Sequence, residues 1–123
     1  MSKSQKEAIV RYRDETEEAS CPYGQVERIV TGGEGGSANV HVVTVSEGDK
    51  HYHSSYDEVY YILSGHGTIT LNEEKHSLTP GAVVVIPAGV QHALKAELGE
   101  DLEFIIFGTP PVSIDSPEAA PRN

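Results

Sequence analysis

The stretch HYHSSYDEVYYILSG, residues 51 to 65, decides how this sequence is interpreted. It places His51 and His53 two positions apart and Glu58 five positions after His53. Because successive side chains of an extended strand point to opposite faces, His51 and His53 share a face and converge on one point. The polar residues between His53 and Glu58 predict a loop or bend, which returns Glu58 to the same place.

A second segment, GAVVVIPAGVQHAL at 81 to 94, supplies His92 after a Pro-x-Gly turn. Imidazole suits Zn, Fe and Ni, and a carboxylate adds a hard oxygen that also suits Mn. An HxH pair alone is common on solvated strands, so the prediction depends on the whole set. We predict that one divalent ion per chain, of Fe, Mn, Ni or Zn, is bound by His51, His53, Glu58 and His92. An ion that prefers six ligands would keep two positions for water, dioxygen or a chelating substrate.

At these residues the chain resembles the cupin family, whose two motifs combine HxH, a glutamate and a later histidine with glycines at set spacings. The resemblance covers roughly residues 25 to 110, and its short spacer is similar to that of small single-domain microbial cupins. It implies an all-β, antiparallel jelly-roll barrel that binds a metal. Two positions depart from the motifs: Gly48 lies closer to HxH than usual, and Ala96 replaces a closing Asn. The matching positions are His51, His53, Glu58, Gly65, Gly81, Pro87, Gly89 and His92.

The distribution of β-branched and aromatic residues also predicts many short strands. Polar or glycine-rich breaks separate them, with turns expected at residues 72–75 and 80–81 and a flexible bend at 32–36. Short strands at regular spacing favour an antiparallel sandwich or barrel. The expected strands are 38–45, 58–63, 67–71, 82–86 and 102–107, with weaker candidates at 25–30, 75–78 and 92–96.

The length of 123 residues suits one compact domain. We expect an N-terminal arm at 1–24, a barrel at 25–110 and a proline-rich tail at 111–123. The arm is expected to be a short helix or a segment lying on a partner subunit, and the tail to be extended or disordered. Small sheets commonly protect their edge strands by pairing, so a symmetric homodimer is expected.

The charge balance limits the partners. Lys+Arg 9 against Asp+Glu 19 gives a formal net charge of -10, which opposes binding to nucleic acid and to anionic membranes. The sequence has no apolar run long enough for a transmembrane helix and no secretory signal, so a cytoplasmic location is expected. Cys21, the single cysteine, forms no internal disulfide and is interpreted as a turn residue before Pro22.

Residues beyond the four metal ligands are harder to assign. If Glu58 points inward, alternation also turns Tyr60 inward, which makes Tyr60 the candidate catalytic residue. Its phenol would donate a hydrogen bond or act as an acid or base, although a core aromatic with a satisfied hydroxyl fits equally well. The direction of His41 stays open between an orienting partner and a pocket wall. His66 and His76 are expected to be solvated.

Three classes of function fit this pattern. The preferred class is a mononuclear metal-dependent enzyme acting on a small polar molecule that chelates through oxygen. Within it we favour non-haem oxygenase chemistry, because two adjacent open positions accept substrate and dioxygen together. Redox-neutral isomerase, lyase or decarboxylase reactions use the same ligands and stay open. The other classes are a non-catalytic module that binds or senses a metal and a small molecule, and a structural cupin whose histidines bind nothing.

Overall fold

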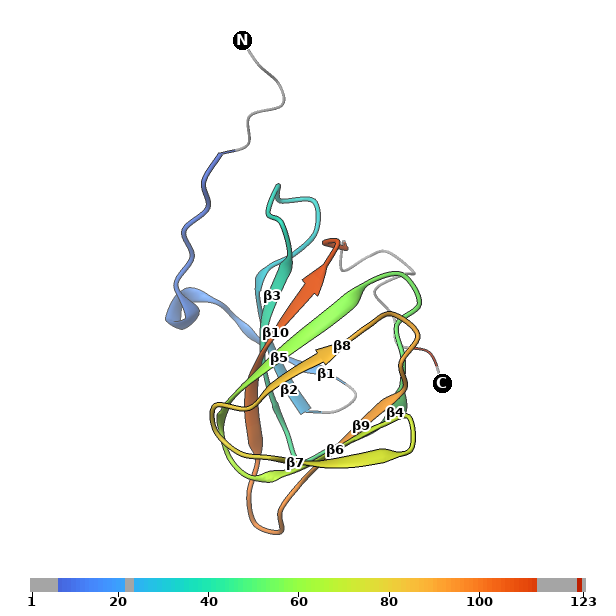
Figure 1. Cartoon of the computed structure of the whole chain (residues 1–123). Helices are drawn as coiled ribbons and strands as arrows, with labels where there is room; N and C mark the ends of the chain where they lie inside the picture. Colours follow the sequence, from blue (N-terminus) through green and yellow to red (C-terminus); the bar gives the residue numbers. More distant parts are fainter. Residues whose placement is uncertain (1–6, 22–23, 113–121, 123) are drawn as a thin grey trace.

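The computed structural model describes residues 7–21, 24–112 and 122, and they form two antiparallel β-sheets (Figure 1). The larger sheet has the strand order β1-β2-β3-β10-β5-β8, and the smaller has the order β4-β9-β6-β7. The predicted all-β antiparallel class is therefore confirmed. The strands are β1 (Glu18–Cys21), β2 (Gly24–Val30), β3 (Asn39–Val45), β4 (Glu47–His51), β5 (Asp57–Ser64), β6 (Gly67–Leu71), β7 (Glu74–Leu78), β8 (Val83–Ile86), β9 (His92–Ala96) and β10 (Leu102–Thr109).

All eight strands expected from the sequence are present, and their ends differ from the expected ends by at most two residues. The sequence did not predict β1 and β4, whose sequences EASC and EGDKH contain no β-branched or aromatic residue. Each is extended because it pairs with a neighbour, β1 with β2 and β4 with β9. Pairing across a sheet therefore overrides the weak intrinsic preference of these two segments.

The expected turns are also present. Asn72 has a positive φ of 54° at the tip of the β6–β7 hairpin. Thr79 accepts a backbone hydrogen bond from Ala82 at 3.0 Å, and Gly81 between them has a φ of 90°. A residue with this φ at the third position of a turn is normally glycine, which explains the Pro-Gly pair.

The hydrophobic core lies between the inner faces of the two sheets. Strand β5 illustrates how the sequence produces it, because its inward residues Glu58, Tyr60 and Ile62 are buried while its outward residues are at least partly exposed. This period of two is expected for a strand with one buried face. The buried apolar residues are Val26, Val43, Val45, Tyr60, Ile62, Ile69, Leu78, Val84, Ile86, Leu94, Ala96, Leu102 and Phe104.

The outer face of the larger sheet carries exposed apolar side chains. Tyr61 on β5 pairs with Val83 on β8, and Phe107 on β10 lies opposite Val59. Tyr61, Val83, Val85 and Phe107 are all exposed. The expected homodimer stays a prediction. Within the described residues, no helix combines the length and hydropathy needed to span a membrane.

The N-terminal segment runs away from the sheets (Figure 1). From residue 7 on, where the structure describes this segment, it contains a 3-10 turn, η1 (Arg13–Glu15). The Arg13 guanidinium forms ion pairs with Glu27 at 2.9 Å and Glu103 at 2.7 Å, which attach the turn to β2 and β10. The expected tail lies outside the described residues, apart from its first two positions and Arg122. The backbone of Arg122 pairs with Tyr52, between two of the candidate ligands.

Candidate metal centre

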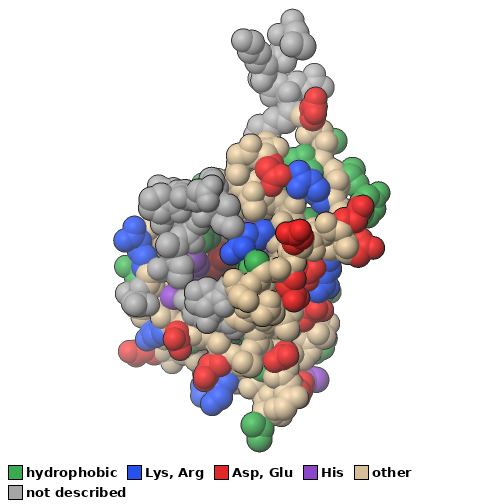
Figure 2. Space-filling model, turned by 180° about the vertical axis from the view of Figure 1, so that it is seen from behind, with side chains coloured by type: hydrophobic (Ala, Val, Ile, Leu, Met, Phe, Trp, Pro, Cys, Tyr) green, Lys and Arg blue, Asp and Glu red, His purple; other side chains and the backbone are tan. Residues whose placement is uncertain are grey.

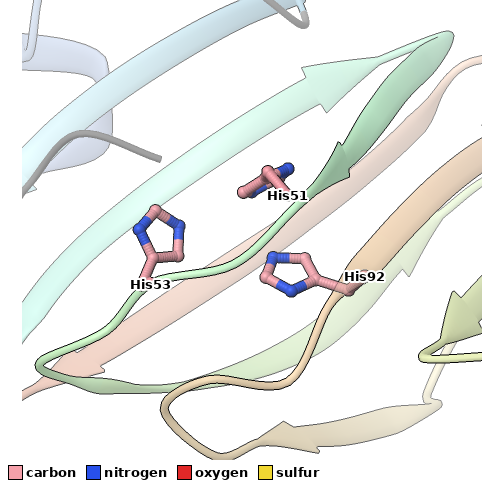
Figure 3. Close-up of side chains that lie close together, drawn as sticks. All are labelled: His51, His53 and His92. Carbon is pink, nitrogen blue, oxygen red and sulfur yellow. The ribbon is translucent and has the colours of Figure 1, made fainter. Parts of the chain in front are cut away.

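Three histidines from two segments of the chain lie close together (Figure 3). His51 ends β4, His53 follows it in the loop to β5, and His92 begins β9. The register of β4 and β9 sets His51 directly opposite His92. One ring nitrogen from each of the three residues lies within 4.8 Å of the other two, and all three side chains are buried. This cluster could hold a metal ion.

The turn before His92 connects the two segments. Gly89, at a φ of 88°, donates its backbone N–H to the carbonyl of His53 at 2.7 Å. Ala88 donates its backbone N–H to Oδ1 of Asp57 at 2.8 Å. The Pro-x-Gly sequence thus places backbone donors against the loop that carries His53, and this fixes the distance between the two segments.

Glu58 joins the cluster from β5. Its side chain is buried, and Oε1 lies 3.4 Å from Nε2 of His92 and 3.6 Å from Nε2 of His53. The loop that was expected to return Glu58 toward the histidines does so. The structure therefore brings together all four residues predicted as ligands, and their binding of a metal stays a prediction.

Hydrogen bonds on the far side of each ring fix how the histidines present their nitrogens. Nδ1 of His51 lies 2.8 Å from the carbonyl of Asp49, and Nδ1 of His92 lies 3.0 Å from the carbonyl of Val90. A carbonyl only accepts, so both Nδ1 atoms carry the proton and both Nε2 atoms keep a lone pair. Orientation of a ligand ring by a partner on its other nitrogen is usual at metal sites.

The ring of His53 is held at its Nδ1 atom by Tyr56. Its phenol oxygen lies 2.6 Å from Nδ1 of His53, and the two rings stack with centroids 4.6 Å apart. The sequence did not predict this role, although Tyr56 is the single aromatic residue between His53 and Glu58. Burial and the charge of Glu58 raise the pKa of the Tyr56 phenol, so it stays neutral.

Two observations are compatible with a divalent cation at this cluster. Nε2 of His92 is buried and has no hydrogen-bond partner in the described part of the chain, which costs about 1–3 kcal/mol if nothing binds it. Two donors that are each about 2.1 Å from one ion lie about 3.0–3.5 Å apart. The 3.4 Å between Nε2 of His92 and Oε1 of Glu58 falls in that range.

The protonation states agree with this fit. Burial lowers the pKa of His51, and it lowers the pKa of His53 to about 4, so both rings are neutral near pH 7. Burial alone would raise the pKa of Glu58, but the neighbouring rings of His92, His53 and His51 together bring it below its ordinary value. Neutral imidazoles beside a carboxylate are the forms that bind metals.

Tyr60 points inward, as alternation predicted, and is 2% exposed. Its hydroxyl donates to Oε1 of Glu58 at 3.3 Å, and its ring packs 4.7 Å from that of Phe104. The phenol therefore reaches the cluster through Glu58, and a catalytic role for Tyr60 stays a prediction. The exposed His66 and His76 lie outside the cluster.

Comparison with known proteins places this geometry in a family. Residues 38–108 match the family model described as Cupin domain. An uncharacterized protein from Streptomyces coelicolor is 32% identical over 77 residues, which cover 63% of this chain and 72% of that protein. The family match, residues 38–108, includes His51, His53, Glu58 and His92.

Solved structures share the fold. A protein from Planctomyces limnophilus has a TM-score of 0.80 at 27% identity, covering 99% of this chain and 100% of that one. Two enzymes are similar in fold at lower identity. Ectoine synthase from P. lautus has a TM-score of 0.75 at 18% identity, covering 86% and 80% of the two chains. The nucleoside dehydratase Pac13 has a TM-score of 0.70 at 19% identity, covering 85% and 83%. With its family match, its two-sheet jelly roll and its buried histidines, the chain belongs to the cupin family.

Proposed function

We propose that this protein is a mononuclear metal-dependent enzyme acting on a small polar molecule that chelates through oxygen atoms. The supporting observation is a set of buried donor atoms gathered in one place. Three imidazoles and one carboxylate meet there, and the buried Nε2 of His92 makes no hydrogen bond among the described residues. An unpaired buried nitrogen is costly in a purely structural core, whereas a metal ligand requires it.

His51, His53, Glu58 and His92 would hold the ion. When bound, the ion would polarise substrate oxygens as a Lewis acid, and a redox-active ion such as Fe(II) would add electron transfer to dioxygen. The single carboxylate leaves a dication with a net positive charge, so the site favours an anionic oxygen ligand. The carbonyls of Asp49 and Val90 hold two of the rings in position throughout.

Tyr60 is the candidate for moving a proton. Its hydroxyl contacts Oε1 of Glu58, so a proton that leaves or reaches the phenol is next to the carboxylate. The short path between these oxygens would let Tyr60 act as an acid or base toward a substrate held beside Glu58. The same contact would also serve to orient Glu58, and Tyr60→Phe removes both roles at once. Lost turnover with unchanged metal affinity would favour proton transfer over orientation of Glu58. Unchanged turnover in Tyr60→Phe would exclude proton transfer by the phenol.

Two reaction classes use this arrangement. The four-ligand set favours a non-haem oxygenase, because a six-coordinate ion would retain two positions for substrate and dioxygen. A redox-neutral isomerase, lyase or decarboxylase reaction is the second candidate, and the buried phenol beside Glu58 favours it because such reactions need a proton carrier. The dehydratase named above has a similar fold, which supports redox-neutral chemistry as a candidate.

A direct test is reconstitution of metal-free protein with Fe(II), Mn(II), Ni(II) or Zn(II) under anaerobic conditions, followed by elemental analysis. We expect one ion per chain for at least one of these metals. Each loaded form is then given a panel of 2-oxo acids, 2-hydroxy acids and enediols while oxygen uptake and product formation are recorded. Oxygen uptake would support the oxygenase, and product without uptake would support the redox-neutral class. Ligand binding without product would support a non-catalytic module, and absence of all four metals would contradict the proposal.

A further inference from the structure

One row of inward-facing residues crosses the larger sheet beside the metal cluster. The strand register sets Tyr60 opposite Ile106, Ile106 opposite His41, and His41 opposite Arg28. Residues directly opposite each other in antiparallel strands share a face, and Tyr60 faces the barrel interior. His41 and Arg28 therefore face the interior as well.

His41 is polar, mostly buried and incompletely satisfied. Its Nε2 atom is buried and makes no hydrogen bond in the described residues. Burial lowers the pKa of His41 to about 4, and the nearby charge of Arg28 lowers it further while that of Glu58 opposes this. His41 thus presents a neutral ring between a guanidinium on one side and the cluster carboxylate on the other. A buried ring nitrogen in such a place needs a partner, and the surrounding apolar residues supply none.

Arg28 differs from the other arginines of the N-terminal half. Arg11 and Arg13 each pair with surface carboxylates, Arg11 with Glu34 and Arg13 with Glu27 and Glu103. Arg28 is partly buried and forms no ion pair or hydrogen bond with the residues that the structure describes. A partly desolvated guanidinium without a carboxylate partner is suited to bind an anion from outside the chain, because its planar donors match a carboxylate in two parallel hydrogen bonds.

We propose that Arg28 and His41 form a subsite for a carboxylate group of the substrate. The substrate would then be a small anion that directs chelating oxygens toward the cluster and a carboxylate toward Arg28. Tyr60 and Arg28 lie three strands apart in the larger sheet, so their Cα atoms are roughly 14 Å apart across the strands. This separation supports a substrate whose chelating group and carboxylate group bind at two different places. Figure 2 shows histidine, basic and acidic side chains side by side on one face of the molecule.

This inference deepens the proposed function and rests on it for the chelating end of the substrate. The carboxylate end depends on Arg28 and His41, neither of which is a proposed metal ligand. The two parts are therefore separable by experiment. The probe is succinate, which carries a carboxylate at each end, and the matched neutral probe is its diamide, succinamide. Binding of both is measured by calorimetry to Zn(II)-loaded and to metal-free protein, and zinc content is recorded for every variant.

We expect loaded wild type to bind succinate more tightly than succinamide. Arg28→Gln should weaken succinate binding about tenfold or more, with zinc content and thermal unfolding unchanged. Arg28→Lys should restore part of the affinity, because it returns the charge without the planar donors. His41→Phe should weaken succinate binding by a smaller factor. Arg11→Gln, which removes an arginine that pairs with a surface glutamate, is the matched control and should bind as wild type does.

Equal succinate affinity in Arg28→Gln and wild type would contradict the proposed subsite. So would a loss of succinate affinity in Arg11→Gln as large as that in Arg28→Gln, or the absence of succinate binding to both metal-loaded and metal-free wild type. Failure of the metal proposal looks different. In that case wild type takes up no zinc, while the effect of Arg28→Gln on succinate persists in metal-free protein.

Discussion

Strand β5 lines both a polar and an apolar part of the barrel interior, and the two parts differ in how they satisfy their side chains. Glu58 lies among the histidines of the cluster, whereas Ile62, four residues further along the same face, is fully buried among apolar neighbours that include Phe104. Tyr60 lies between them and contacts both parts, through its hydroxyl to Glu58 and its ring to Phe104. One strand therefore supplies ligand chemistry at one end and packing at the other.

The contrast shows where each kind of mutation should act. In the apolar part, removal of atoms leaves a void, and the cost appears as lost stability. In the polar part, side chains are held by specific donors and acceptors, and the loss of one donor should appear mainly as lost ligand binding. If the two parts are as separate as β5 suggests, stability and metal content should respond to different substitutions.

The largest effect is expected in the apolar part, for Phe104→Ala. Phe104 is 1% exposed and packs against Tyr60, so truncation should lower the free energy of unfolding by about 3–5 kcal/mol. Chemical denaturation of metal-free protein measures this change. Phe107→Ala, an exposed phenylalanine on the same strand, is the control and should cost far less. Similar losses for both variants would contradict the placement of the core.

In the polar part, His53→Ala should abolish stoichiometric metal. Loss of one of four ligands should weaken metal binding by at least about 100-fold and abolish activity, since loss of an outer partner alone costs 10- to 100-fold. Unfolding of the metal-free protein should change less than in Phe104→Ala. Elemental analysis after reconstitution measures the metal, and His76→Ala provides an exposed histidine as the control. One ion per chain in His53→Ala would refute its assignment as a ligand.

A backbone position in the turn after β5 allows a sharper test of stability. Gly65 has a φ of 90°, and a Cβ built there would lie 2.1 Å from the backbone oxygen of Asp101. Gly65→Ala should therefore destabilise the fold by about 1–3 kcal/mol or more without changing the metal content. Gly99→Ala is a matched control, because Gly99 has a φ of 82° but open space around its Cβ position. Equal losses would show that backbone strain alone, and not the contact with Asp101, limits this turn.

The sequence predicted the parts of the structure that depend on local pattern. The spacing of His51, His53 and Glu58, and the Pro-x-Gly turn before His92, are short-range features, so the meeting of these residues was predictable. His53 lies in the loop after β4, however, and not in the strand from which its direction was expected. The role of Tyr56 was missed, because a tyrosine in a polar loop gives no signal of which ring it will contact. The direction of Arg28 was also missed, since it follows from the register of β2 against β3, across a glycine-rich connection.

The smallest effect is expected for Tyr56→Phe, at the border of the polar part. The phenol oxygen 2.6 Å from Nδ1 of His53 holds that ring in orientation, and its loss should weaken metal binding about tenfold while one ion per chain still binds at saturation. Competition with a chelator measures the affinity. Tyr61→Phe removes an exposed hydroxyl from the outer face of β5 and should leave the affinity unchanged. A Tyr56→Phe protein that binds metal as tightly as wild type would mean that stacking against His53, which phenylalanine preserves, is sufficient to orient the ring. The polar part would then depend on packing as the apolar part does, and the contrast between them would be confined to the ligands themselves.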